Sequence, residues 1–239
     1  MEKNQKKLVN KFIPIIQARM GSSRLPGKSL MKIGEYKLID WVINYAKKNF
    51  FNEKIYVATT KSKDDDTLVE YLTNRDIKIF RGNELNVFSR FENISRNFNP
   101  DDIIVRFTGD NPIKNNLIIQ LMKSEVIKNN IDYCCLKDLS KLSVEFIKIK
   151  LIDQIQSTDY FDDDDKEHVT WNIRNKLDCN KLIIDQSKHK MIPKLDKLIT
   201  IDTLEDVSFL EKLLKKINII PGEDLNLILL YNAIKSLKN

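Results

Sequence analysis

Short apolar runs alternate with amphipathic segments along most of the chain, and this alternation constrains the fold more than any other feature. The runs that predict buried strands are 12–17, 54–58, 77–80, 103–107, 131–136 and 198–201. Apolar residues recur at helical spacing between these runs, over 38–49, 65–74, 87–97, 117–129 and 204–217. Short strands that alternate with helices are typical of a mostly parallel sheet with helices on both faces. The sequence therefore predicts an α/β fold, in which ligands bind beyond the carboxyl ends of the strands.

Residues 138–190 interrupt this alternation. Segment 143–150 is rich in β-branched and aromatic residues, which predicts a strand at the edge of the sheet. The acidic run 162–165 predicts a solvated loop, because four consecutive aspartates lack the ligand spacing of a calcium-binding loop. We interpret 138–190 as a small lobe inserted in a single domain that spans 1–239. Pro221-Gly222 predicts a break before a last helix, which begins at about residue 223.

The chain carries a net charge of +6, from 40 basic and 34 acidic residues. Basic residues are interleaved with acidic ones, and no stripe combines basic with aromatic residues, so we expect no nucleic-acid partner. The hydrophobic content of 42% is that of a globular protein. No apolar run approaches the roughly 20 residues that cross a bilayer, so we expect no membrane partner.

Cysteine usage and the start of the chain bear on the cellular compartment. Cys134, Cys135 and Cys179 have neither the spacing of a metal site nor that of a disulfide framework. The adjacent pair falls in a predicted strand, so at least one of the two is expected in the core. No apolar core of a signal peptide follows the first residues. Together these features predict a cytoplasmic protein.

The first predicted strand stops at Gln17 and leads into a loop of glycines and serines. This loop also carries three cationic side chains, those of Arg19, Arg24 and Lys28. A strand that runs into such a loop presents backbone N–H groups to phosphate. The three cations would repel one another without an anion between them, which favours a polyphosphate. The segment therefore predicts a nucleotide site.

Two alternatives are open at this loop. In a P-loop, four residues separate the first glycine from the Gly-Lys-Ser/Thr element, whereas here five separate Gly21 from Gly27, and a proline precedes Gly27. The extra residue and the proline would move the loop amides, which argues against P-loop phosphotransfer. The other alternative is a basic turn without a ligand. The clustering of the cations and the entropic cost of the glycines count against it.

Two aspartates follow predicted strands elsewhere in the chain. Asp110 follows strand 103–107 in a Gly-Asp turn, which by itself is more often structural than functional. Asp202 follows segment 198–201 and precedes a helix, where it or Thr203 could simply be the N-cap. If both strands end at one edge of the sheet, the two carboxylates meet. Mg²⁺ typically takes one or two carboxylates together with phosphate oxygens and waters.

Residues 17–28, Gln-Ala-Arg-Met-Gly-Ser-Ser-Arg-Leu-Pro-Gly-Lys, resemble the N-terminal motif of the CMP-sugar synthetase superfamily, which includes the acylneuraminate and Kdo cytidylyltransferases. The Gln-Ala-Arg-Met variant is most similar to the spore-coat polysaccharide cytidylyltransferase-like branch. The resemblance implies a Rossmann-like α/β fold, CTP as the nucleotide, Mg²⁺ as the cofactor and a homodimer.

The same resemblance implies roles for individual residues. It implies nucleotide contacts at Gln17, Ala18, Arg19, Gly21, Ser22, Arg24, Lys28, Arg81 and Asp110. Arg81 lies in an Arg-Gly turn that leads into a helix, and Arg90 in that helix is a weaker match. The residues expected to carry catalysis are Arg19, Lys28, Asp110 and Asp202, of which the two aspartates match the family's metal ligands.

Residues 167–170, Glu-His-Val-Thr, resemble an element that lies toward the acceptor sugar in the spore-coat-like branch. The resemblance implies that Glu167 and His168 contact the acceptor. Glu145 falls where that branch often has an acidic residue, so it is also expected at the acceptor. The other histidine, His189, is expected to be structural.

The reaction implied by the resemblance is transfer of CMP from CTP to an acidic sugar, such as a Kdo-like or nonulosonic acid, with release of pyrophosphate, for surface glycan biosynthesis. One alternative keeps the chemistry with a sugar phosphate, phosphonate or polyol phosphate as the acceptor. Another is a non-catalytic protein of the same fold that binds a nucleotide sugar. Metal-dependent CTP binding favours the enzyme, whereas binding of a finished sugar nucleotide alone favours the binding protein.

Overall fold

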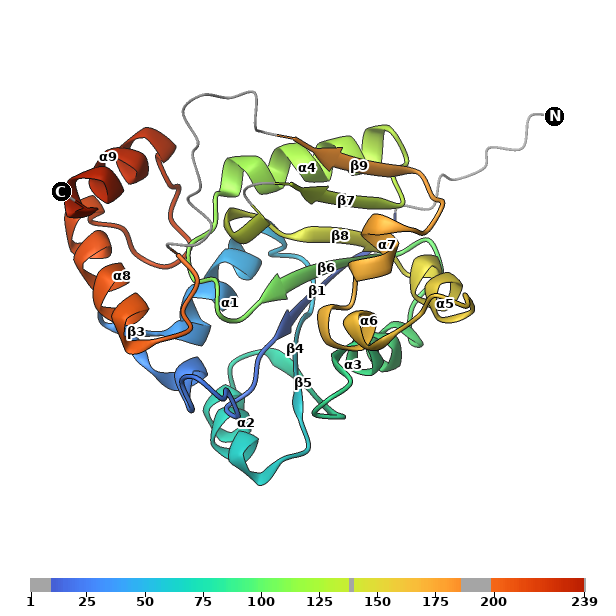
Figure 1. The fold of residues 1–239 in the computed structure, drawn as a ribbon, viewed down its shortest axis with the longest axis horizontal. Helices are drawn as coiled ribbons and strands as arrows, with labels where there is room; N and C mark the ends of the chain where they lie inside the picture. The colour runs from blue at the N-terminus through green and yellow to red at the C-terminus, as the bar shows by residue number, and fades with distance from the viewer. Residues whose placement is uncertain (1–9, 138–139, 186–198, 239) are drawn as a thin grey trace.

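The computed structural model describes residues 10–137, 140–185 and 199–238, which are built around one central sheet (Figure 1). The sheet has seven strands in the order β5-β4-β1-β6-β8-β7-β9. Their bounds are β1 Phe12–Gln17, β4 Ile55–Thr60, β5 Ile77–Gly82, β6 Ile103–Thr108, β7 Tyr133–Leu136, β8 Glu145–Lys148 and β9 Lys181–Ile184. A separate antiparallel pair is formed by β2 Lys32–Ile33 and β3 Tyr36–Lys37.

Most neighbouring strands of the sheet are parallel. Four strands run in one direction, β1, β4, β5 and β6. β8 is antiparallel to both of its neighbours, β6 and β7, and β7 is parallel to β9. The chain fills the sheet outward from β1 to β5 and then returns to place β6 on the other side of β1. The carboxyl ends of β1 and β6 therefore form a topological switch point, where open α/β sheets bind ligands. Gln17 and Thr108 mark this point, because they are paired at the two strand ends.

Helices cover both faces of the sheet (Figure 1). The helices whose apolar residues join the core of one face are α1 Leu38–Asn49, α2 Asp66–Leu72, α4 Asn116–Lys128, α8 Leu204–Ile217 and α9 Leu227–Lys238. Those on the side of the other core are α3 Val87–Ser95, α5 Lys150–Gln156, α6 Asp163–His168 and α7 Trp171–Asn175. Side chains alternate along the strands, so in β1 Ile16 packs in the first core and Ile15 in the second. The predicted α/β fold, with a mostly parallel sheet between two helical layers, is confirmed.

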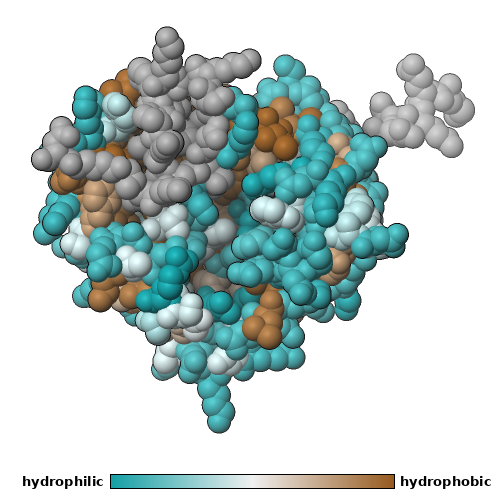
Figure 2. Space-filling model, in the orientation of Figure 1, coloured by the Kyte–Doolittle hydropathy of each residue, from teal (hydrophilic) through white to brown (hydrophobic). Residues whose placement is uncertain are grey.

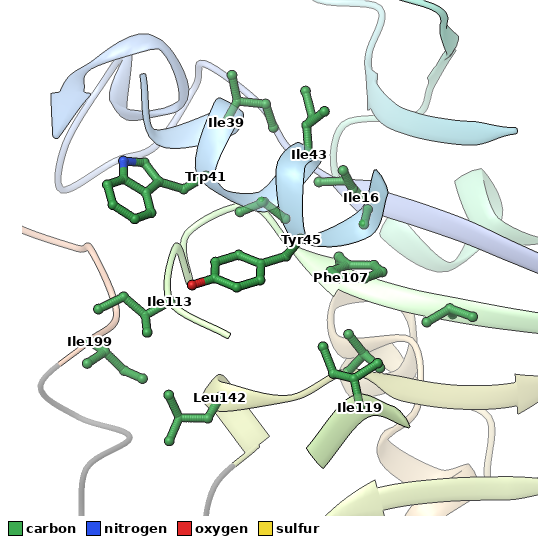
Figure 3. Close-up of a cluster of buried hydrophobic side chains, with 14 of the residues drawn as sticks. Ile16, Ile39, Trp41, Ile43, Tyr45, Phe107, Ile113, Ile119, Leu142 and Ile199 are labelled. Carbon is green, nitrogen blue, oxygen red and sulfur yellow. The ribbon is translucent and has the colours of Figure 1, made fainter. Parts of the chain in front are cut away.

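The first core joins the N-terminal half of the chain to its C-terminal part. Trp41 and Tyr45 of α1 are almost fully buried. Figure 3 shows the Tyr45 ring extending from α1 toward Ile113, Leu142 and Ile199. Ile199 belongs to the segment before α8, and burial of an aliphatic side chain of this kind contributes roughly 1.5–3 kcal/mol. This packing holds the residues before α8 beside the loop that follows β6.

The strand predicted over 198–201 is absent from the described residues 199–201. Ile199 and Ile201 are nevertheless buried, so the apolar pattern reports burial correctly. The N–H of Ile201 donates to the carbonyl oxygen of Asp110 at 2.9 Å, which attaches the segment to the loop after β6. The strand prediction is wrong for these residues because their backbone joins a loop instead of a strand.

β8 lies inside the sheet, whereas the sequence predicts a strand at its edge for segment 143–150. β8 pairs with β6 on one side and with β7 on the other, and β9 forms that edge of the sheet. Strand position depends on pairing, which local composition does not encode. Cys134 and Cys135 lie buried in β7, which confirms that this pair contributes to the core.

The acidic run 162–165 begins α6, so the prediction of a loop is wrong, although residues 162–164 are exposed to solvent as predicted. Asp162 accepts a hydrogen bond from the N–H of Asp165, whose own carboxylate is fully buried. That carboxylate accepts bonds from the backbone and side-chain N–H groups of Asn172 at 2.8 and 2.7 Å. A hydrogen-bonded carboxylate tolerates burial, which the run's composition does not reveal. The predicted structural residue His189 lies outside the described residues.

Across the described ranges, no helix is long and apolar enough to cross a bilayer.

Candidate functional site

A cleft of about 440 Å³ opens at the carboxyl ends of β1 and β6. Figure 2 shows this face of the molecule hollowed near its centre, with mostly hydrophilic residues around the hollow. Basic side chains outnumber acidic ones in the cleft walls, which include Arg19, Arg24, Lys28, Arg90, Arg106 and Lys141 and the carboxylates of Asp110, Glu167 and Asp202. An excess of positive charge in a cleft attracts polyanions.

Lys28 joins the two aspartates that the sequence predicts as a pair. Its Nζ donates to the carbonyl oxygen of Ile201 at 2.7 Å and to Oδ1 of Asp202 at 3.0 Å, and it lies 3.6 Å from Oδ2 of Asp110. Thr203 is the N-cap of α8, which leaves the Asp202 carboxylate to the cleft. The structure therefore brings Asp110 and Asp202 to one point.

The carboxylates at this point fit Mg²⁺. Within the described residues, no three His, Cys, Asp or Glu side chains converge on a common position, so the protein offers the pair Asp110 and Asp202. Both side chains remain accessible from the cleft, with exposed fractions of 33% and 26%. Mg²⁺ is usually held by one or two carboxylates, with waters and substrate phosphates completing its shell. The pair matches that requirement.

A buried carboxylate that the sequence did not reveal holds the loop after β1. Asp65 accepts hydrogen bonds from the N–H of Met20 and from the hydroxyls of Thr59 and Thr60, each at 2.6 Å. Burial by itself raises the pKa of Asp65, but these hydrogen bonds outweigh it and lower the pKa overall. Gly27 closes the loop at φ 77°, a conformation that glycine adopts without strain. The loop is therefore fixed by the protein's own contacts.

Most predicted residues of this loop reach the cleft. Those that line it are Gln17, Ala18, Arg19, Ser22, Arg24 and Lys28. Gly21 is not among the lining residues and instead faces Glu84, whose Oε1 would lie 3.3 Å from a Cβ at this position.

Gly109 is needed for a close approach of two backbones. The predicted Gly-Asp turn is present, because the N–H of Asn111 donates to the carbonyl oxygen of Thr108 at 3.3 Å, but the φ of Gly109 is not positive, so the turn itself does not require a glycine. A Cβ at Gly109 would lie 2.8 Å from the carbonyl oxygen of Gln17, closer than real Cβ contacts come. The bare glycine lets the end of β6 approach the end of β1 and thereby places Asp110 in the cleft.

Arg81 does not line the cleft, although the sequence predicts a nucleotide contact there. Its guanidinium donates to the carbonyl oxygens of Thr60 and Ser62 at 2.8 and 2.7 Å and pairs with Asp66 at 2.6 Å. These contacts tie the end of β5 to the segment between β4 and α2. The geometry gives Arg81 a structural role.

Arg90 of α3 lines the cleft instead. Its side chain is 98% buried, its Nε has no hydrogen-bond partner, and its Nη1 makes one long bond of 3.3 Å to the carbonyl oxygen of Ala58. Burial, and then the nearby charge of Arg19, lower the pKa of Arg90 to about 10. The stem crosses Gly82, where a Cβ would come within 2.6 Å of it. A buried cation with so few hydrogen-bond partners destabilises the folded protein unless an anion binds beside it.

A second cavity of about 280 Å³ adjoins the cleft and shares part of its wall. The shared residues are Arg106, Thr108, Lys141 and His168. Val144, Trp171 and Arg174 are among the residues that line only the second cavity, and Glu167 lines only the cleft. Of the predicted acceptor residues, His168 therefore lies at the boundary between the two spaces, and Glu167 lies on the side of the cleft.

Glu145 lies in the wall of the second cavity and directly opposite Arg106 in the β6–β8 pair. Its carboxylate accepts hydrogen bonds from Arg106, from Arg174, from the Tyr133 hydroxyl at 2.7 Å and from the Thr170 hydroxyl at 3.1 Å. Burial by itself raises the pKa of Glu145, but the two arginines outweigh it and bring the pKa to about 2. The carboxylate is therefore charged at neutral pH.

Sequence reasoning missed Arg106, Arg174 and Lys141 as residues of these spaces. Arg106 does give a signal, because it is the single charged residue in the mostly apolar β6. Arg174 and Lys141 lie in short helical turns within the irregular part of the sequence, and no local pattern marks them.

The stability of the protein should depend on pH through Glu145. A carboxylate whose pKa falls from 4.5 to about 2 on folding contributes stability of about 3 kcal/mol above pH 4.5, which is lost as the pH falls toward 2. Glu145→Gln removes this contribution. We expect the gap in unfolding free energy between wild type and variant, measured with urea, to be smaller at pH 3 than at pH 7. The exposed Glu70→Gln is the matched control, and an equal gap at both pH values would contradict the assignment.

Comparisons with known proteins point to one family. The model of the cytidylyltransferase family matches residues 13–236. The chain is 30% identical over 214 residues to the spore coat polysaccharide biosynthesis protein SpsF of Bacillus subtilis, covering 87% of this chain and 88% of that protein. It is 40% identical over 129 residues to an uncharacterized protein of Methanocaldococcus jannaschii, covering 54% of this chain and about half, 53%, of that protein. A 3-deoxy-manno-octulosonate cytidylyltransferase of Leptospira interrogans is 30% identical over 112 residues, 44% of this chain and 42% of that enzyme.

Solved structures share the fold over nearly the whole chain. A cytidylyltransferase from Leptospira borgpetersenii superposes with a TM-score of 0.78 at 25% identity, covering 96% of each chain. A CMP:2-keto-3-deoxy-manno-octonic acid synthetase complexed with CTP gives a TM-score of 0.62 at 14% identity, covering 86% of this chain and 99% of that one, which shows the fold alone. Because the family model and the SpsF match both span most of the sequence, the chain belongs to the cytidylyltransferase family.

Proposed function

We propose that the protein transfers CMP from CTP to an acidic sugar and releases pyrophosphate, for the synthesis of a surface glycan. The observation that carries the proposal is the meeting of Asp110 and Asp202 around Lys28 at the switch point, in a cleft with an excess of basic side chains. The family of the chain, its SpsF relative and the fold shared with a synthetase complexed with CTP support it.

In this proposal the triphosphate of CTP occupies the cleft beside the loop after β1. Arg19, Arg24, Lys28 and Arg90 would bind its phosphates, because charge-assisted hydrogen bonds to phosphate are strong. Asp110 and Asp202 would hold Mg²⁺, which neutralises phosphate charge when bound. Lys28 is held by its hydrogen bonds to Ile201 and Asp202, so its side chain needs little reorganisation as negative charge develops.

The acceptor would occupy the second cavity. A hydroxyl oxygen of the acceptor attacks the α-phosphorus of CTP and gives up its proton to solvent. A new P–O bond forms, and the bond to the β-phosphate oxygen breaks, so that pyrophosphate leaves. Trp171 and Val144 offer apolar surface to the C–H faces of a sugar ring, and the arginines offer positive charge to its carboxylate. Glu167 and His168 would contact the acceptor at the boundary with the cleft.

Isothermal titration with nucleotides tests the proposal. We expect CTP to bind with Mg²⁺ more tightly than UTP, ATP or GTP, and we expect the protein to release pyrophosphate from CTP in a screen of acid sugars. If CTP fails to bind with Mg²⁺ while a finished CMP-sugar binds alone, the protein is a non-catalytic binding module. If pyrophosphate appears with a sugar phosphate and with no acid sugar, the acceptor assignment is wrong.

We also propose that the protein works as a homodimer in the cytoplasm. The dimer rests on the resemblance of the sequence to CMP-sugar synthetases, and the free thiols of Cys134, Cys135 and Cys179 fit a reducing compartment. Light scattering at micromolar concentration measures the mass directly. A mass of 28 kDa, that of one chain, would contradict the dimer.

A further inference from the structure

Both oxygens of the Asp202 carboxylate are bound by cations of the loop after β1. Oδ1 accepts the hydrogen bond from Nζ of Lys28 at 3.0 Å, and Oδ2 forms an ion pair with Nη2 of Arg24 at 2.9 Å. A carboxylate that holds Mg²⁺ gives it an oxygen at a distance of about 2 Å. A cation on that same oxygen would repel the metal strongly. One of the two cations must therefore leave Asp202 when the metal binds.

The two cations differ in how firmly they are held. Nζ of Lys28 also donates to the carbonyl oxygen of Ile201 at 2.7 Å, and only 13% of the Lys28 side chain is exposed. The Arg24 side chain is 66% exposed. An exposed arginine changes its partner readily, because solvent already weakens the ion pair. Arg24 is therefore the cation that can leave Asp202.

The remaining charges of the cleft do not favour a metal ion on its own. Apart from His168, six basic and three acidic side chains line the cleft, so positive charge is in excess. This excess repels a dication and attracts a polyphosphate. A polyphosphate also offers Arg24 a new partner, because a guanidinium group binds phosphate strongly. The binding of metal and the binding of phosphate are therefore linked through Arg24.

We propose that Arg24 occupies Oδ2 of Asp202 in place of the metal until a polyphosphate draws it away, so that the divalent metal binds together with the nucleotide and only weakly without it. The inference rests on the proposed function only for the assignment of Asp110 and Asp202 to a divalent metal. It predicts that removal of Arg24 strengthens metal binding. An arginine that only binds phosphate, or only supports the fold, does not have that effect.

Binding of Mn²⁺ without nucleotide tests the proposal. Mn²⁺ takes the same oxygen ligands as Mg²⁺, and the EPR signal of the free ion measures how much is bound. We expect Arg24→Met to bind Mn²⁺ at least five-fold more tightly than the wild type, because the variant lacks a positive charge beside the ligand of the metal. Calorimetry should show that the same variant binds metal-free inorganic triphosphate at least five-fold less tightly.

Two other arginines are the controls. Arg96 is as exposed as Arg24 and pairs with Glu92 of α3, so Arg96→Met should change neither affinity. Arg19 belongs to the same loop as Arg24, but it lies 3.8 Å from Glu84 instead of on an aspartate. Arg19→Met should therefore weaken triphosphate binding and leave the affinity for Mn²⁺ within two-fold of the wild type.

The gain in Mn²⁺ affinity should disappear when Asp202→Asn is added to Arg24→Met, because the metal then lacks the carboxylate that Arg24 vacates. Unchanged or weaker Mn²⁺ binding in Arg24→Met overturns the proposal, and so does a gain that persists in the double variant. Arg24 is mostly exposed, so the single variant is expected to fold.

Nucleotide titration separates this inference from the proposed function, since neither Mn²⁺ nor triphosphate is a nucleotide. If both probes respond to Arg24→Met as expected but CTP does not bind, the proposed function is wrong and the role of Arg24 stands. If CTP binds with Mg²⁺ and Arg24→Met leaves Mn²⁺ binding unchanged, the inference is wrong and cytidylyl transfer stands.

Discussion

Replacing Asp110 and Asp202 together with asparagine is expected to lower the rate of pyrophosphate release from CTP by about 1,000-fold, since even one lost transition-state contact costs 100- to 1,000-fold. Asparagine keeps the shape of aspartate and removes the two charges that would hold Mg²⁺ beside the phosphates. Lys28 keeps its bond to the carbonyl oxygen of Ile201, and the cleft becomes more basic. We therefore expect CTP to bind still, but without dependence on Mg²⁺.

Calorimetry with and without Mg²⁺, together with a coupled pyrophosphate assay, measures both effects. The matched control is Asp76→Asn, because Asp76 is an exposed aspartate that pairs with Lys54 far from the cleft. Its left-handed backbone, φ 54°, suits asparagine equally well. An unchanged rate in the double variant would show that the two carboxylates do not hold the metal.

Arg90→Met and Arg81→Met are expected to have opposite effects. Arg90 is a buried cation whose Nε has no partner, so methionine should stabilise the ligand-free protein by about 1 kcal/mol. The same change should weaken CTP binding by about 10- to 100-fold, the value of a charged hydrogen bond to phosphate. Arg81 binds two carbonyl oxygens and Asp66, so its loss should destabilise the protein by about 1–2 kcal/mol and leave CTP affinity unchanged.

Urea unfolding and nucleotide titration of both variants check this contrast. The two arginines lie nine positions apart in sequence and carry the same charge, so each serves as the control for the other. If Arg81→Met weakens CTP binding and Arg90→Met does not, the roles inferred from the geometry are reversed. If methionine at position 90 destabilises the ligand-free protein, the buried guanidinium has partners of its own.

The spacing of apolar residues predicted the helices and strands whose ends depend on residues close in sequence. α1 and α8 have the predicted ends, because their apolar faces are regular and a carboxylate three residues into each helix binds the N-cap N–H, Asp40 to Lys37 in α1 and Asp206 to Thr203 in α8. β1 also has its predicted bounds. Segment 199–201 shows the limit of this reasoning, since buried apolar residues look alike whether their backbone pairs with a strand or, as for Ile201, with a loop. The interior position of β8 likewise depends on long-range pairing.

The candidate site shows the same division. The loop after β1 and the two aspartates were predictable, because each follows an apolar run that ends abruptly. The sequence did not predict that Arg90 and not Arg81 lines the cleft. The outcome depends on the direction in which each side chain leaves its element, β5 for Arg81 and α3 for Arg90. The cluster around Glu145 required the antiparallel β8, which places Glu145 opposite Arg106. No pattern within either segment encodes that register.

The backbone hydrogen bond from Ile201 to Asp110 has a consequence for how the protein folds. It closes a loop that contains most of the second half of the chain, and such closures cost entropy that is recovered only after the distant segments meet. The strands from β1 to β6 need no residue beyond 108 to pair with one another. During refolding, Asp110 and Asp202 should therefore meet later than the strands from β1 to β6 pair, and recovery of activity should report the completed chain rather than its N-terminal half.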